Sequence, residues 1–284
     1  MTYTYNSAIR LGMVSLNVKD LTNMTNFYTE IIGLSILSQD DNKSLLTFDG
    51  KEAIIELRLV NSDQEATYGL YHTAILVPNR NALGLALRQI LVTQAPLDGA
   101  ADHGYSEAIY ISDPEGNGVE IYRDKDVSEW DVKEDGQIIG VTDPMDGQSM
   151  LDNLTEIPEV YKLDPATIIG HVHLSVHNAL ASSQLYQKVF QMGNKMTIPT
   201  ASWIASGQYH HHLAFNNWGG PSLQKHQESN LGLNYLTIEY SDQICFDATF
   251  KKAQLHGMIV IEKEKNNYLL EDLDGIRTHV TLVK

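Results

Sequence analysis

Two histidines and one glutamate from the middle of the chain could together bind a divalent metal. His72 and His171 each begin a short apolar strand pattern, and Glu120 ends the turn-rich segment 113–120, which reads DPEGNGVE. Two neutral imidazoles and one carboxylate on one face of a metal leave about three adjacent positions open, which is the ligand set of non-haem Fe(II) oxygenases. A chelating substrate can take two of these positions and O2 the third.

A single histidine in a strand is more often a surface or hydrogen-bonded core residue than a metal ligand. The metal hypothesis therefore depends on His72 and His171 occupying the same place in a repeated unit. His173 competes with His171, because it lies two residues further along the strand and faces the same side. We prefer His171, since its register matches that of His72.

Four related segments of the sequence must position these side chains. Each segment begins with a short alternating or apolar strand, at residues 13–18, 72–77, 171–176 and 235–240. An amphipathic helix follows the strand, and strand-like pieces separated by turn signals follow the helix. The repeated unit is therefore one strand, one helix and about three more strands.

A unit of this size cannot bury its sheet alone, so we expect the units to pair. The predicted fold is α+β, with four βαβββ modules paired into two cup-shaped half-barrel sheets. Residues 8–124 and 168–284 would each form a domain of two modules, joined by a polar, proline-containing linker at residues 125–167. Alternate residues of the curved strands would line each cup.

The pairing of the units decides whether the metal ligands can meet. The equivalent positions of units one and four carry Met13, Tyr235 and His279, a poor set of metal ligands, so we expect one site per chain. His171 and Glu120 lie in different halves of the sequence, and the site therefore requires unit two to pack with unit three, and unit one with unit four. If units one and two paired instead, His171 would lie far from Glu120 unless a dimer brought them together.

Composition limits the class of protein and of partner. The chain has 284 residues, a formal net charge of -16, 43% hydrophobic and 20% charged residues. The negative charge argues against nucleic acid and anionic membrane surfaces as partners, because both select for an excess of Lys and Arg. A single cysteine, Cys245, excludes a disulfide framework within the chain. The sequence begins without a secretory-signal pattern and has no apolar run near the ~18 residues of a transmembrane helix, so we expect a soluble, cytoplasmic protein.

The residues around Glu120 resemble the signature of the type I extradiol dioxygenases, which belong to the vicinal oxygen chelate superfamily together with glyoxalase I. Within that superfamily the chain is most similar to the bacterial catechol 2,3-dioxygenase group. The matching positions are His103, Ile109-Tyr110, Asp113-Pro114, Gly116 and Glu120. Ala101 departs from the signature, which favours Gly, Asn, Thr, Ile or Val there. The signature also lies in unit two, whereas in the best-known extradiol enzymes it lies in the final unit.

The resemblance implies a role for each of the matching side chains. Glu120, His72 and His171 would be the metal ligands. His103 and Tyr110 would hydrogen-bond the substrate oxygens and the leaving intermediate.

The resemblance also implies an acid/base histidine. Residues 210–215, HHHLAF, are similar to a strand of the family that reads HH-x-L-A-F. Its second histidine, His211, would transfer the substrate proton. His210 or His212 could take this role instead. Because His210 and His212 share the strand face opposite to His211, only one of these choices can point into the cup.

The implied activity is cleavage of catechol, or of a substituted catechol, by O2 beside the diol, giving a 2-hydroxymuconate semialdehyde. The implied cofactor is Fe(II), and Mn(II) accepts the same ligands. The implied partners are a small aromatic diol, O2 and further copies of the chain in a homo-oligomer. Trp203, Phe215 and Trp218 are candidates for an apolar wall, although aromatic residues in such strands more often belong to the core. Two alternatives within the same fold stay open, namely a glyoxalase-like metal-dependent isomerase or thiol transferase, and a non-catalytic small-molecule-binding protein.

Overall fold

Four βαβββ modules make up the computed structural model, which describes residues 3–283. Module one comprises β1 (Ile9–Val18), α1 (Leu21–Asn26) continued by η2 (Phe27–Ile31), β2 (Ser35–Gln39), β3 (Lys43–Thr47) and β4 (Ile55–Leu59). Module two comprises β5 (Gly69–Leu76), α2 (Arg80–Thr93), β6 (Leu97–Asp102), β7 (Ser106–Ser112) and β8 (Gly118–Asp124). Module three comprises β11 (Ile168–Ser175), α4 (Ala179–Phe190), β12 (Gly193–Ile198), β13 (Ala201–Ala205) and β14 (Leu213–Asn216). Module four comprises β15 (Gly232–Tyr240), α5 (Gln243–Leu255), β16 (Ile259–Lys263), β17 (Asn267–Glu271) and β18 (Arg277–Leu282). The α+β prediction and the module order are confirmed.

Each module helix begins at a side chain that caps it. Asp or Asn stands at the N-cap of all four helices and accepts a hydrogen bond from the backbone N–H three residues later, which satisfies a donor that the helix itself leaves unpaired. The four capping residues are Asp20, Asn79, Asn178 and Asp242. The same local chemistry therefore starts the helix after the first strand of every module.

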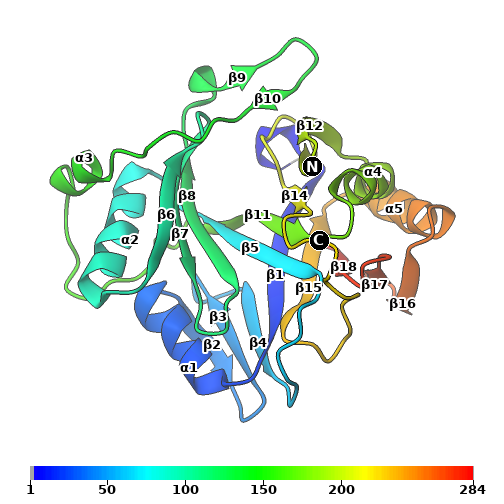
Figure 1. Cartoon of the computed structure of the whole chain (residues 1–284), viewed down its shortest axis with the longest axis horizontal. Helices are drawn as coiled ribbons and strands as arrows, with labels where there is room; N and C mark the ends of the chain where they lie inside the picture. Colours follow the sequence, from blue (N-terminus) through cyan, green and yellow to red (C-terminus); the bar gives the residue numbers. More distant parts are fainter. Residues whose placement is uncertain (1–2, 284) are drawn as a thin grey trace.

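The modules pair across the two halves of the chain. The first sheet has the strand order β16-β17-β18-β15-β1-β4-β3-β2, so it joins module one to module four. The second sheet has the order β12-β13-β14-β11-β5-β8-β7-β6, so it joins module two to module three. Antiparallel pairs join the modules, β1 with β15 and β5 with β11, and both lie at the centre of Figure 1. The pairing that the metal hypothesis required is confirmed.

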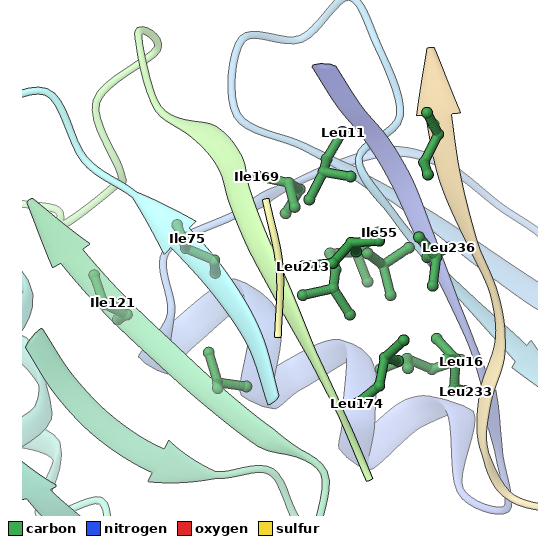
Figure 2. Close-up of a cluster of buried hydrophobic side chains, with 14 of the residues drawn as sticks. Leu11, Leu16, Ile55, Ile75, Ile121, Ile169, Leu174, Leu213, Leu233 and Leu236 are labelled. Atoms are coloured by element: carbon green, nitrogen blue, oxygen red, sulfur yellow. The ribbon is translucent and has the colours of Figure 1, made fainter. Parts of the chain in front are cut away.

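The two sheets bury one apolar face against each other. Leu16, Ile55 and Leu236 of the first sheet point toward Ile75 and Leu174 of the second in Figure 2. These side chains are all 0% exposed, and helices lie at the periphery of the sheets in Figure 1. Because neighbouring residues of a strand face opposite sides, the residues between these core positions line the other face of each sheet.

The segment between the halves is more than a connection. It contains η3 (Val127–Glu129), β9 (Asp131–Val132), β10 (Ile138–Ile139) and α3 (Gly147–Asp152). Trp130 and Ile138 of this segment form a small apolar cluster with Tyr105, Ala205 and Tyr209 of the second sheet and its loops. The hairpin β9–β10 extends beside the top of this sheet in Figure 1.

The proposed domain boundaries fall where β8 ends, at Asp124, and where β11 begins, at Ile168. Because each sheet combines strands from both halves, we keep the division into two domains as a proposal. A short helical turn, η1 (Thr4–Asn6), precedes β1. Across residues 3–283 no helix has both the length and the apolar character needed to span a bilayer.

Candidate metal centre

His72, Glu120 and His171 converge on the outer face of the second sheet. Nε2 of His72 lies 3.0 Å and Nε2 of His171 lies 3.1 Å from the same Glu120 oxygen, and the two nitrogens are 3.3 Å apart. Within residues 3–283 no other group of three or more His, Cys, Asp or Glu side chains brings its ligand atoms together as closely as a metal requires. The sequence-predicted ligands are therefore adjacent in space.

Strand register explains why these three side chains meet. Ala74 of β5 lies opposite His171 of β11 and beside Glu120 of β8, and His72 precedes Ala74 by two residues on the same face. The small side chain at position 74 leaves room between the three larger ones. A bulge at Gly170 shifts the register just before His171.

Burial and mutual contact set the charge of the cluster. Burial by itself would raise the pKa of Glu120, but the charge of His171 and hydrogen bonds from both histidines hold that pKa well below its usual range. Burial lowers the pKa of His171 to about 4, against the opposing effect of Glu120. An ionised carboxylate beside a neutral imidazole is the state in which such side chains bind a metal. The chemistry of the donor set thus fits a divalent cation.

His173 faces the same side of β11 but does not join the cluster. It lies opposite His72 across the strand pair, and the Asn216 side-chain amide donates to its Nε2 at 3.1 Å. Burial holds the pKa of His173 well below its usual range. Between the two histidines that the sequence offered, His171 is the one in contact with Glu120.

A tyrosine and a histidine form a hydrogen-bonded pair at the edge of the cluster. Nδ1 of His103 lies 2.7 Å from the carbonyl oxygen of Val141 and must donate to it, so Nε2 is left to accept from the Tyr110 hydroxyl at 2.6 Å. Tyr110 lies opposite Glu120 in the β7–β8 pair, and its ring centroid is 5.8 Å from that of His72. Burial raises the pKa of Tyr110, so this hydroxyl keeps its proton.

The three consecutive histidines do not alternate as predicted. Residues 210–212 precede β14 and lie in a bend, so the period of two that applies to a strand does not hold there. Nδ1 of His210 and Nδ1 of His211 are 2.8 Å apart, which places neighbouring side chains together. His211 lies nearest the cluster, with its ring centroid 4.1 Å from that of His171. The centroid of His210 is 6.3 Å from that of His171, and His212 accepts from the Ser206 backbone instead.

The predicted apolar wall is only partly in place. The Phe215 prediction is wrong, because that ring packs on Tyr186 of α4 in the main core, on the other face of the sheet. Trp203 and Trp218 lie near His173, with ring centroids at 6.3 and 5.5 Å. Trp218 is 48% exposed, so it lies at the rim of the cup.

The first sheet repeats the arrangement with other residues. Ser15 lies beside Glu56 in β1–β4 as Ala74 lies beside Glu120 in β5–β8, so Glu56 is the equivalent of Glu120. Sequence reasoning missed this residue. Its signal is a glutamate between apolar neighbours in the last strand of a module, the same pattern that surrounds Glu120. Glu56 accepts from the Ser15 hydroxyl at 2.7 Å.

Comparison with known proteins agrees with this architecture. The family model of the Glyoxalase/Bleomycin resistance protein/Dioxygenase superfamily matches residues 10–121. The chain is 31% identical to the catechol-2,3-dioxygenase of Bacillus subtilis (strain 168) over 268 residues. This alignment covers 92% of this chain and 93% of that relative.

Solved structures share the fold at low sequence identity. Glyoxalase I from Zea mays is 15% identical with a TM-score of 0.60, over 97% of this chain and 93% of that one. The cppA protein from Streptococcus pneumoniae TIGR4 is 15% identical with a TM-score of 0.55, over 98% of this chain and 99% of that one. From the fold, the site and the full-length relative together, the chain belongs to the glyoxalase/bleomycin resistance protein/dioxygenase superfamily.

Proposed function

We propose that the protein is an extradiol dioxygenase that opens catechol, or a substituted catechol, with O2 to give a 2-hydroxymuconate semialdehyde. The proposal includes His72, Glu120 and His171 as ligands of Fe(II), with Mn(II) as the alternative ion. The observation that carries it is the position of Tyr110 and His211, which flank this three-residue cluster from two sides. The full-length similarity to a catechol-2,3-dioxygenase supports the same substrate class.

A metal bound by these ligands would supply Lewis acidity toward the catechol oxygens and the redox capacity that a reaction with O2 needs. The other steps fall to the side chains around it. His211 would accept the proton of one catechol hydroxyl through the lone pair of a ring nitrogen, which is free because burial lowers the pKa of the ring and keeps it neutral. In that transfer the O–H bond breaks, the proton joins a ring nitrogen, and the catechol oxygen keeps the electron pair.

Tyr110 would orient the ring-opening end of the substrate. Its hydroxyl is directed to Nε2 of His103, and the oxygen retains lone pairs that can accept from a substrate hydroxyl. Val141 fixes His103 through a backbone carbonyl, so the pair is held by a part of the chain far from both residues. Burial of the cluster and its flanking side chains would limit access of water to reactive species.

The test is reconstitution of the full chain with Fe(II) in the absence of air, followed by catechol and then air. We expect stoichiometric O2 uptake and the yellow colour of the ring-fission product. Glu120→Gln should abolish both signals, whereas His279→Ala, a histidine on the other sheet, should preserve them. If the chain binds iron but consumes no O2 with catechol, 3-methylcatechol or 4-methylcatechol, the proposed dioxygenase activity is rejected. The isomerase alternative would then be tested by turnover of a hemithioacetal under the same conditions.

A further inference from the structure

A buried chain of hydrogen bonds leads away from the candidate metal centre behind His211. Nδ1 of His211 lies 2.8 Å from Nδ1 of His210, and Nε2 of His210 lies 2.8 Å from the carboxylate of Asp124. His210 and His211 are 1% and 4% exposed, and Asp124 ends β8, four residues after Glu120. Neither Asp124 nor His210 takes part in the metal binding or in the proton transfer proposed for His211.

The acceptor character of the Asp124 carboxylate fixes the direction of these hydrogen bonds. The Tyr5 hydroxyl donates to one carboxylate oxygen at 3.0 Å and the Tyr209 hydroxyl donates to the other at 3.4 Å. Tyr209 in turn pairs with the Tyr122 hydroxyl at 2.6 Å. An ionised carboxylate only accepts hydrogen bonds, so the nitrogen of His210 that faces Asp124 must carry a hydrogen.

Each neutral imidazole has one N–H, and this determines the rest of the chain. If Nε2 of His210 donates to Asp124, Nδ1 of His210 has a lone pair and must accept from Nδ1–H of His211. Nε2 of His211 then has no hydrogen. A doubly protonated His210 would reverse this pattern, since it would donate to His211 and leave Nε2 of His211 protonated.

Aromatic side chains hold the middle of this chain in place. The Tyr105 ring stacks on His210 with centroids 4.3 Å apart and an interplanar angle of 16°. Tyr209 lies on the same imidazole at 4.0 Å, and Trp130 from the linker lies at 5.3 Å. The His210 ring therefore has little freedom to rotate away from either Asp124 or His211.

We propose that Asp124 and His210 are positioning residues that fix His211 in its Nδ1–H tautomer, so that Nε2 is presented as the proton acceptor. The value of this tautomer for catalysis rests on the proposed dioxygenase function. The tautomer itself does not, because it follows from the hydrogen bonds of the chain together with a neutral His210. His212 provides an internal comparison, since its Nδ1 accepts from the Ser206 backbone N–H at 3.3 Å and its hydrogen must then be on Nε2.

The test is a long-range ¹H–¹⁵N correlation spectrum of the full, ¹⁵N-labelled chain after treatment with a chelator, with resonances assigned by single substitutions. We expect the Nδ1–H form for His211 and the Nε2–H form for His210 and His212. His210→Phe keeps a flat ring but removes the acceptor, so His211 should change to a mixture of tautomers. Tyr5→Phe, which removes one donor to Asp124 and leaves the two histidines paired, should leave all three tautomers unchanged.

A wild-type spectrum with a protonated Nε2 on His211 would overturn the proposal, even if no variant folded. An unchanged His211 tautomer in a folded His210→Phe protein would also overturn it. If the dioxygenase proposal holds, Asp124→Asn should lower kcat by about tenfold or more with little change in KM, as expected for a disturbed general base. Failure of the dioxygenase proposal would leave the spectrum of the wild-type chain unaffected, so the two outcomes are separable.

Discussion

The hydroxyl of Tyr28 in module one donates to the carboxylate of Asp113 in module two, at a distance of 3.2 Å. These modules are neighbours in sequence but their strands lie in different sheets, so this buried hydrogen bond joins η2 of the first module to the β7–β8 turn of the second. The same contact recurs in the second half, where Tyr186 donates to Asp272 at 3.2 Å. Each aspartate also accepts from backbone N–H groups of its own turn, which orients the carboxylate toward the tyrosine.

The stability of the protein should fall as pH rises through the titration of Asp113. Burial raises the pKa of Asp113 to about 6, despite hydrogen bonds from Asn117, Glu115 and Tyr28 that lower it. Above the unfolded-state pKa of about 4, the folded chain keeps this proton longer than the unfolded chain, so it binds more protons between about pH 4 and 6. Between pH 5 and pH 8 this group alone should lower the free energy of unfolding by about 1.4 kcal/mol.

Asp113→Asn should remove that component of the pH dependence. Urea denaturation of the variant and the wild type at pH 5 and pH 8 measures the difference. Asp63→Asn is the matched control, since the Asp63 side chain is 98% exposed and should contribute no such component. Equal pH dependence in Asp113→Asn and wild type would show that this carboxyl titrates normally. Asp272, whose pKa burial raises to about 7, should give a similar result at higher pH.

Metal binding should depend on the cluster of the second sheet and not on its counterpart in the first. His72→Ala and Glu120→Ala should each lower the bound Fe(II) from one per chain to near zero, because two remaining ligands seldom retain such an ion. His279→Ala and Glu56→Gln change the equivalent places of the first sheet and should leave metal content intact. Metal analysis after gel filtration measures all four variants. Full occupancy in both ligand variants would refute the assigned set.

Tyr110→Phe should separate catalysis from metal binding. Phenylalanine keeps the ring opposite Glu120 but removes the hydroxyl that donates a hydrogen bond to Nε2 of His103. We expect unchanged Fe(II) content and a fall in kcat of about 10²-fold, in the range of one positioned proton-transfer or hydrogen-bonding group. Steady-state O2 uptake with catechol gives the rate. Loss of the metal in this variant would instead assign Tyr110 a role in holding the ligands.

The sequence predicted the modules, and the two histidines that meet Glu120, because both are repeated. A strand followed by an amphipathic helix recurs four times, and His72 and His171 occupy the same place in two of these units. Alternation along strands then decides which face each side chain lines. The sequence already favours His171 over His173, and the register of β5 and β11, in which a bulge intervenes, agrees with that choice.

What the sequence did not predict depends on backbone and long-range geometry. The carbonyl of Val141 fixes His103 from 38 residues away, and a carbonyl carries no residue-specific signal. The match to a strand motif predicts strand alternation for residues 210–212, but the strand pairing that would enforce it begins at Leu213. The contact between Asp124 and His210 spans 86 residues and joins two different modules, so no local pattern contains it.

Gly170→Ala should destabilise the protein by about 1 to 3 kcal/mol, because a methyl group has no space there. A Cβ at this position would overlap the Tyr122 hydroxyl and lie 2.7 Å from Cζ of the same ring and 2.9 Å from Cβ of Leu76. Tyr122 is fully buried and its ring lies 4.9 Å from that of His171, so it cannot move without disturbing the candidate site. The glycine thus leaves room for the Tyr122 side chain of β8 to pack against β11, on the far side of β5 and next to a proposed metal ligand.

Gly12 is the matched control, since it occupies the equivalent bulge of the first sheet. A Cβ there would meet the carboxylate end of Glu239 at 2.5 Å, and this flexible side chain can move aside, so Gly12→Ala should cost less. Tyr122→Phe removes the overlapping hydroxyl and should restore part of the stability of Gly170→Ala in the double variant. Urea denaturation of the single and double variants measures the coupling. Strictly additive effects of Gly170→Ala and Tyr122→Phe would contradict the overlap as the cause.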